Sequence, residues 1–178
     1  MKVAEAEAKK REPHINHLFR TAHFAYETSN IVGFLGEFSV CSMLGIDWEE
    51  NIRKDYVVAD SGDIRYKDLV IDVKTETMPN VYMSMLLGGI IRDNDKYGRR
   101  LIPEDQLSRI GNYDAIIFGV MPRETLSDWY GLGYVLTEDI LKHDPTATTQ
   151  RPDGGEYPFA CLPIKTSYLR SINELLNM

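Results

Sequence analysis

The stretch Ser61-Gly-Asp-Ile-Arg-Tyr-Lys-Asp-Leu-Val-Ile-Asp-Val-Lys-Thr75 decides the predicted fold, because apolar and polar residues alternate along it with a period of two. Such alternation is typical of strands with one buried face, so we expect two adjacent antiparallel strands. A turn at Lys67-Asp68 would join them and set their register. The predicted cross-strand pairs are Tyr66 with Leu69 and Ile64 with Ile71.

The polar face of this predicted hairpin carries Asp63, Asp72 and Lys74, with Asp63 directly across from Asp72. Two like charges opposite each other destabilise a sheet, and a cation between them removes the conflict. Mg²⁺ suits such oxygen ligands, because it takes one or two carboxylates and leaves its other positions to water and substrate phosphate. Lys74 could then contact a phosphate or an attacking water. The alternative is a solvated hairpin edge with ordinary surface charges.

A helix with one buried stripe is predicted ahead of the hairpin, over Ile31–Gly45. Glu37 lies beside the stripe, and a buried carboxylate needs a partner. Gly33 and Gly36 each cost a helix about 1 kcal/mol relative to alanine. They indicate that another backbone or a ligand approaches the helix closely, with simple glycine packing as the alternative.

These three stretches together resemble the PD-(D/E)xK nuclease superfamily: Gly33-Phe-Leu-Gly-Glu37, Gly62-Asp63 and Ile71-Asp-Val-Lys-Thr75. The resemblance extends over about residues 30 to 121 and implies a restriction-endonuclease-like core. The motif proline is absent, since Gly62 precedes Asp63, as in many members of the superfamily. By position, the resemblance implies that Asp63, Asp72 and the Val73 carbonyl hold the metal, that Lys74 orients or activates water, and that Glu37 assists the metal site.

The expected function is therefore metal-dependent hydrolysis of phosphodiester bonds in nucleic acid. The resemblance implies a DNA endonuclease that uses Mg²⁺, with Mn²⁺ as a possible substitute, and leaves 5′-phosphates. An RNA-directed nuclease of the same chemistry is one alternative. The other is a non-catalytic interaction module in which the hairpin acids are structural.

Size and composition fit a single domain over residues 1–178. Of the 178 residues, 43% are hydrophobic and 26% charged, which is globular composition, and the length suffices for one core but not for two ordinary domains. The net charge of -7 argues against a protein that coats nucleic acid through a general positive field. We expect a cytoplasmic protein without a membrane span, because no segment approaches roughly 20 consecutive apolar residues and no signal peptide is evident.

The densest basic stretch after the amino terminus, Arg92-Asp-Asn-Asp-Lys-Tyr-Gly-Arg-Arg100, is predicted to be a polar loop. In an acidic protein its cations are candidates for phosphate contacts, and Tyr97 is available to stack on a base. A merely solvated loop is the alternative. Gln106, on a short helix predicted over 103–110, could reach the active site as a polar residue does in some family members. The predicted nucleic-acid contacts are Arg92, Lys96, Arg99, Arg100 and Gln106.

The amino-terminal part is predicted to carry no chemistry of its own. Residues 1–12 read as a flexible or helical arm. The following helix presents His14, His17, Arg20 and His23, which drift around the helix axis and are expected to form a solvated face, with phosphate contact by Arg20 as the alternative. Asp60, just before the hairpin, is expected in a turn and is the rival metal ligand to Asp63.

The remaining segments predict an α/β domain with a mixed central sheet flanked by helices. Strands are expected over 51–59, 113–121 and 131–137, with 113–121 at the centre, and a long loop over 143–158. Residues 81–91 are expected to be a helix packed on the sheet or a segment that moves with substrate. The apolar stripe of the last helix closes the core or makes a homodimer contact; its residues are Leu169, Ile172, Leu175 and Leu176.

Overall fold

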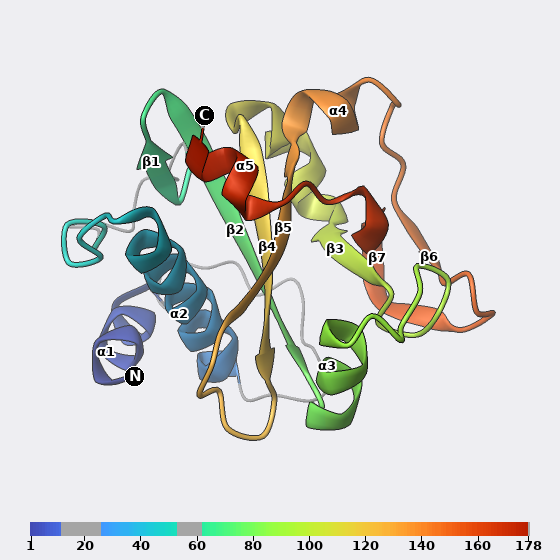
Figure 1. Ribbon diagram of the computed structural model, residues 1–178, viewed down its shortest axis with the longest axis horizontal. Coiled ribbons are helices and arrows are strands. Elements are labelled where there is room, and N and C mark those ends of the chain that lie inside the picture. The colour runs from blue at the N-terminus through green and yellow to red at the C-terminus, as the bar shows by residue number, and fades with distance from the viewer. Residues whose placement is uncertain (12–25, 53–61, 178) are drawn as a thin grey trace.

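The computed structural model describes residues 1–11, 26–52 and 62–177, and it is an α/β fold with two sheets (Figure 1). The larger sheet has the order β1-β2-β4-β5 and the smaller one β3-β7-β6. The strands are β1 (Ile64–Tyr66), β2 (Leu69–Met78), β3 (Arg99–Pro103), β4 (Ala115–Pro122), β5 (Tyr130–Leu136), β6 (Thr148–Gln150) and β7 (Glu156–Lys165).

The predicted hairpin and its register are confirmed. β1 and β2 are antiparallel, with Ile64 opposite Ile71 and Tyr66 opposite Leu69. Lys67 takes the left-handed conformation that the tight turn requires, with φ of 52°. β2 then runs parallel to β4, and β4 antiparallel to β5, so the predicted mixed sheet is also confirmed. Every residue of β4 is buried, as expected for a central strand.

α2 covers one side of the larger sheet, and the smaller sheet lies on the other side together with α3, α4 and η2 (Figure 1). α2 packs against the face that displays Ile71 and Val73, and α1 packs on the outside of α2. The helices are α1 (Lys2–Arg11), α2 (Tyr26–Leu44), α3 (Asn80–Leu87), α4 (Thr137–Leu141) and α5 (Ile172–Asn177), with 3-10 helices η2 (Glu104–Asn112) and η3 (Thr166–Tyr168).

Two of the core clusters lie on opposite faces of the larger sheet, and this division positions the site. Ile71 and Val73 of β2 belong to the cluster under α2. Ile116 and Phe118 of β4 belong to the cluster shared with β3, η2 and α4. Because side chains alternate along a strand, the residues of β2 at positions 72, 74 and 76 share the face of this second cluster.

At Gly36 the structure favours simple glycine packing, because a Cβ there would collide with the Thr75 hydroxyl of β2 rather than with another backbone. A Cβ on Gly33 would meet no atom of the described residues within 4 Å, and the approach of a ligand there stays a prediction. Trp129 donates a hydrogen bond from Nε1 to Thr75 Oγ1 at 3.1 Å. Gly36 therefore serves close helix-to-sheet packing against a strand side chain, which was the simpler of the two interpretations.

The two chain ends differ in how the predictions fared. Residues 2–11 form a helix, as one of the two predicted forms, but the helix is packed rather than an arm, since Ala4 and Ala8 are buried against Phe34. At the other end, Leu175 is fully buried in the core cluster under α2. Core closure by the last stripe is therefore confirmed, and the homodimer contact stays a prediction.

Two other segments differ from expectation, and a third group of predictions falls largely outside the described residues. The stretch 81–91 forms α3 and a following turn, with Val81 and Ile90 more than 60% exposed, so only part of it packs on the sheet. The predicted loop over 143–158 contains the short strand β6. The predicted strand over 51–59, Asp60 and the histidine face of His14, His17, Arg20 and His23 lie largely or wholly outside the described residues. Within the described part of the chain, no helix is long and apolar enough to cross a membrane.

Candidate active site

The hairpin brings Asp63 and Asp72 together, as the sequence predicts. The Asp63 backbone N–H donates to the Ile71 carbonyl at 3.0 Å, which extends the register beyond β1 and puts Asp63 across from Asp72. The Asp63 carboxylate accepts a hydrogen bond at Oδ2 from the Val73 N–H, at 2.8 Å. Both bonds join Asp63 to β2, so its carboxylate is held against the strand that carries Asp72.

Asp72 and Lys74 form an ion pair that is largely out of solvent. Lys74 Nζ lies 2.5 Å from Asp72 Oδ2, and the two side chains are 19% and 5% exposed. The two residues are neighbours on one face of β2, which makes this contact a direct result of strand alternation. Asp63, Asp72 and Lys74 thus form a compact group with two carboxylates and one ammonium.

The electrostatics of this group are those of charges that share a buried site. Burial raises the pKa of Asp72 to about 6, with the Lys74 ammonium opposing the shift and the Asp63 carboxylate adding to it. For Lys74, burial acts to lower the pKa, but attraction to Asp72 and Asp63 outweighs it and the pKa is raised. The pKa of Lys74 is therefore raised by its two carboxylate neighbours, and the pKa of Asp72 is raised by burial. Perturbed pKa values of this kind concentrate at functional sites.

Tyr113 is a neighbour of this group that sequence reasoning missed. Its pKa is raised by burial and then by the Asp72 carboxylate, with smaller effects from Lys74 and Asp63. A Cβ on Gly62 would lie 3.7 Å from Tyr113 Cδ1, so the ring also borders the chain that leads into Asp63. The parallel pairing of β2 with β4 brings Tyr113 here, and that pairing leaves no local mark in the sequence.

Glu37 is buried, as predicted, at 4% exposure on the inner side of α2. Burial and then the nearby Glu37 carboxylate raise the pKa of Cys41 to about 11. Among the described residues, no three His, Cys, Asp or Glu side chains lie close enough together to hold a metal ion. The described part of the structure therefore joins Asp63 to Asp72 but does not complete a three-residue ligand set with Glu37. The Val73 carbonyl as a ligand stays a prediction.

The basic stretch divides into exposed and engaged residues. Arg92 and Lys96 are exposed, so both are available for phosphate contact. Arg99 is half-buried and donates to the Asp93 carbonyl and to Asn94 Oδ1, each at 3.1 Å. Arg99 therefore shapes the loop as well as carrying charge.

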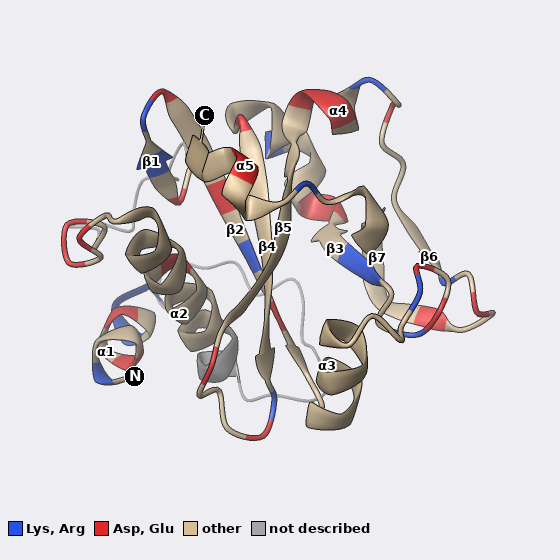
Figure 2. Ribbon diagram, viewed as in Figure 1, with Lys and Arg blue, Asp and Glu red and all other residues tan. Residues whose placement is uncertain are grey.

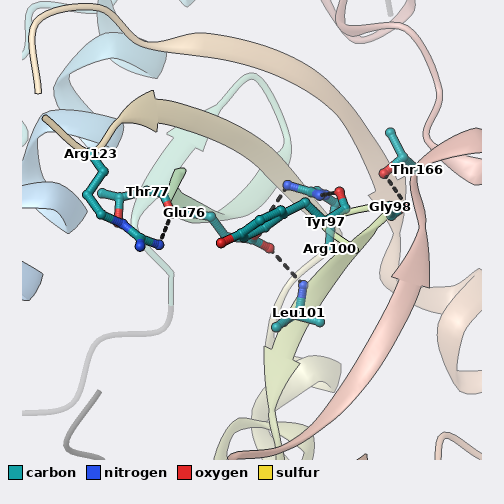
Figure 3. Close-up of polar contacts among 8 residues, drawn as sticks. All are labelled: Glu76, Thr77, Tyr97, Gly98, Arg100, Leu101, Arg123 and Thr166. Carbon is teal, nitrogen blue, oxygen red and sulfur yellow. Dashed lines mark hydrogen bonds and ion pairs between the residues drawn. The ribbon is translucent and has the colours of Figure 1, made fainter. Parts of the chain in front are cut away.

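Arg100 corrects the sequence prediction, because it is fully buried and cannot serve as a surface phosphate contact. The residue lies in β3 rather than in a loop, and the alternation of that strand turns it inward together with Ile102. Its Nη1 donates to Glu76 Oε2 at 3.0 Å, and its Nη2 donates to the Tyr97 carbonyl (Figure 3). Glu76 Oε1 also accepts a bond from the Leu101 N–H at 3.0 Å.

Gln106 lies on η2, which packs on the same face of the larger sheet as Asp72 and Lys74 through Leu107 and Ile110. Its Oε1 is buried and accepts no hydrogen bond from any of the described residues. A buried acceptor without a donor is uncommon and calls for an explanation. The position agrees with a polar residue directed to the site, and the predicted contact with nucleic acid stays a prediction.

Charge over the described molecule is mixed rather than segregated. Basic and acidic residues alternate over the helices, strands and loops, and no broad basic face is visible in this view (Figure 2). Any nucleic-acid contact must then rely on a few well-placed cations near the site.

Comparison with known proteins adds no family to this geometry: no protein-family model, no curated protein and no solved structure matches the chain.

Proposed function

We propose that the protein is a metal-dependent nuclease that hydrolyses phosphodiester bonds, with DNA as the preferred substrate and a restriction-endonuclease-like core. The observation that supports it best is the group of Asp63, Asp72 and Lys74 on two neighbouring strands. Two carboxylates that face each other beside a buried, protonated lysine suit the handling of a metal ion and a phosphate.

The arrangement of β1, β2 and β4 also supports the proposed core. An antiparallel hairpin carries the acids and the lysine, and its second strand continues parallel to a fully buried strand. α2 covers one face of this sheet, and the crossover that links β2 to β4 contains α3, β3 and η2. The order helix, hairpin, crossover and parallel strand is the order that the PD-(D/E)xK resemblance implies.

The donor set fits a hard divalent ion on chemical grounds. Asp63 and Asp72 would hold Mg²⁺, or Mn²⁺ in its place, with the Val73 carbonyl as a further oxygen ligand. Such an ion supplies a bound water of lowered pKa and neutralises charge on the phosphate. Glu37, buried on α2, would hold a second ion or orient its water.

Lys74 would act as the donor that positions the nucleophile. Its ammonium carries three N–H donors and one is directed at Asp72, so others can contact a water or a phosphate oxygen. A fixed donor of this kind lowers the barrier by orienting the attacking water in line with the leaving oxygen. Attack of this water on phosphorus, with departure of the 3′ oxygen, would leave 5′-phosphate and 3′-hydroxyl ends, as the resemblance implies.

A non-catalytic interaction module is the second candidate, and one observation favours it. Asp72 is already paired with Lys74, and the described residues hold no three-ligand group for a metal. In that case the hairpin charges would only stabilise the fold. Calorimetry with Mg²⁺ or Mn²⁺ separates the candidates, because the module predicts either no binding or binding that Asp63→Asn and Asp72→Asn leave unchanged.

The direct test is a nuclease assay with supercoiled plasmid, linear duplex, single-stranded DNA and RNA, in Mg²⁺, Mn²⁺ or EDTA. The expected result is metal-dependent cleavage of DNA that Asp72→Ala abolishes. Preferred cleavage of RNA would make RNA the proposed substrate, with the same chemistry. Equal cleavage by wild type and Asp72→Ala would assign the activity to a contaminant and overturn the proposal.

A further inference from the structure

Two tyrosines and a lysine form a cluster at the end of the smaller sheet. The rings of Tyr82 on α3 and Tyr97 in the loop before β3 have centroids 4.8 Å apart, at an interplanar angle of 50°. Lys96 Nζ lies 5.6 Å from the Tyr82 centroid and 5.3 Å from the Tyr97 centroid. Both tyrosines are half-buried and pack against the core cluster under α3, and Lys96 is exposed. We call this group the aromatic platform.

The loop that presents Tyr97 is held in a conformation that its sequence does not favour. Tyr97 has φ of 65°, the left-handed region that bulky residues seldom adopt. A Cβ on the next residue, Gly98, would collide with the Arg92 carbonyl. Thr166 donates from Oγ1 to the Gly98 carbonyl at 2.8 Å, and the buried Arg100 donates to the Tyr97 carbonyl (Figure 3). Residues held in such regions cluster at ligand-binding sites.

The same arginine connects the aromatic platform to the strand that carries the proposed catalytic group. Arg100 bridges the Tyr97 carbonyl and Glu76, and Glu76 lies on β2 two residues after Lys74, on the same face. Figure 3 shows the Glu76 side chain directed at Arg100 and at the backbone of Leu101. A ligand on the platform would thus be fixed relative to Asp72 and Lys74 through buried, hydrogen-bonded groups.

We infer that Tyr82, Lys96 and Tyr97 bind an unpaired base of single-stranded nucleic acid. Tyrosine rings with an adjacent cation suit a flat base attached to a phosphate, and base–aromatic stacking contributes to single-strand binding without sequence readout. Bases inside a duplex already stack on each other, so their faces are not available to the rings. This inference rests on the proposed function, since it names single-stranded or frayed nucleic acid as the substrate.

A protein partner is the competing occupant, because Val81, Leu87 and Ile90 are exposed beside the platform. Lys96 argues against it. Its ammonium lies over both rings and puts a positive charge where an apolar side chain would have to dock. The same charge attracts the phosphate that is attached to a stacked nucleotide.

The test is fluorescence anisotropy of labelled oligo(dT), oligo(U) and a duplex of equal length, in EDTA so that cleavage cannot interfere. Wild type should bind a single strand more tightly than the duplex, and the two oligomers decide between DNA and RNA. Tyr82→Leu and Tyr97→Leu should each weaken binding by about fivefold to a hundredfold. Tyr97→Phe, which keeps the ring, should bind within about twofold of wild type.

Tyr168→Leu is the matched control, since Tyr168 is exposed and has Lys165 Nζ 4.8 Å from its ring centroid, but lies outside the platform. Its binding should equal that of wild type. Photo-crosslinking of wild type to an oligomer with 5-iodouracil needs no variant that could misfold, and should label Tyr82 or Tyr97.

Three results would each overturn the inference: no binding of a single strand, normal binding by the leucine variants, or crosslinks only at other residues. Binding of a protein at these residues would instead make the surface a protein-docking site. Because these readouts need no catalysis, they are independent of the nuclease assay. Cleavage without dependence on the tyrosines refutes only the platform, and platform binding without cleavage refutes only the nuclease.

Discussion

Two ion pairs lie on the same face of β2 and differ in what they do. Asp72–Lys74 joins two residues of one strand beside a second carboxylate, and it crosses no element boundary. Glu76–Arg100 joins β2 to β3 of the other sheet, and its carboxylate also caps the Leu101 N–H. The first pair adds little to the architecture and leaves an aspartate with a pKa of about 6, whereas the second connects two sheets. Under the proposed function, one strand carries both a pair that serves chemistry and a pair that joins the two sheets.

The largest effect is expected from Lys74→Ala. If the Asp72–Lys74 pair serves catalysis, loss of the ammonium should reduce turnover by about 100-fold to 10,000-fold, because a positioned group of this kind contributes that much. The thermal unfolding midpoint should fall as well, because Asp72 loses its cation and its side chain is only 5% exposed, so turnover is compared at a temperature where the variant is folded. Steady-state cleavage of DNA with Mg²⁺, beside a melting curve, measures both.

Lys67→Ala is the control for this comparison, because Lys67 is an exposed lysine in the turn of the same hairpin. It should cleave at the wild-type rate. Turnover of Lys74→Ala within tenfold of wild type would show that the lysine is a structural charge like Arg100.

Arg100→Met should lower the free energy of unfolding by about 3 kcal/mol and leave the group of Asp63, Asp72 and Lys74 in place. The substitution leaves the Glu76 carboxylate without its cation, although the Glu76 side chain is only 23% exposed. It also removes the hydrogen bond that Arg100 donates to the Tyr97 carbonyl. Chemical denaturation measures the change. Lys142→Ala removes an exposed pair of similar length, 2.9 Å to Asp139, and should leave the unfolding midpoint unchanged.

Adding Glu76→Gln to Arg100→Met should restore part of the lost stability, because the uncompensated charge is removed. A double variant no more stable than Arg100→Met would show that the arginine acts by packing alone. Equal stability of Arg100→Met and wild type would remove the contrast between the two pairs.

The next largest effect is expected in how the free energy of unfolding depends on pH, which reports on the buried Asp72 carboxylate. Since burial raises its pKa in the folded protein to about 6, above the usual 3.8, the folded state holds the proton more tightly than the unfolded state. Wild type should therefore lose stability relative to Asp72→Asn as the pH rises from 4 through 6. The difference should level off above pH 7 at a size on the order of 2 kcal/mol. Urea denaturation at several pH values measures it, and a difference that does not vary with pH would contradict the buried charge.

The hairpin could be predicted from sequence because its information is local. Alternation fixed which residues share a face, and a two-residue turn fixed the register, so Asp63, Asp72 and Lys74 were found together. Arg100 was misplaced because the smaller sheet depends on pairing between β3 and β7, which are far apart in sequence. The alternation Arg99–Pro103 was visible, but a strand with an inward arginine is recognised only when its partner, Glu76, is known. Tyr113 was missed for the same reason, since only the parallel pairing of β2 and β4 places it.

Gln106→Leu should have the smallest effect on stability. It tests whether Gln106, which lies on η2 and not on β2, belongs with the Asp72–Lys74 pair or with the Glu76–Arg100 pair. Within residues 1–11, 26–52 and 62–177, no group donates a hydrogen bond to the buried Oε1 of Gln106, and an acceptor in that state costs folding free energy that an apolar side chain avoids. The variant should therefore be as stable as wild type or more stable, by up to about 1 kcal/mol. If Gln106 belongs with Asp72 and Lys74, its acceptor finds a donor only in the loaded site, and turnover should fall by about tenfold while the melting midpoint holds or rises. Loss of stability without loss of turnover would instead group Gln106 with the Glu76–Arg100 pair, as a residue that holds η2 in place.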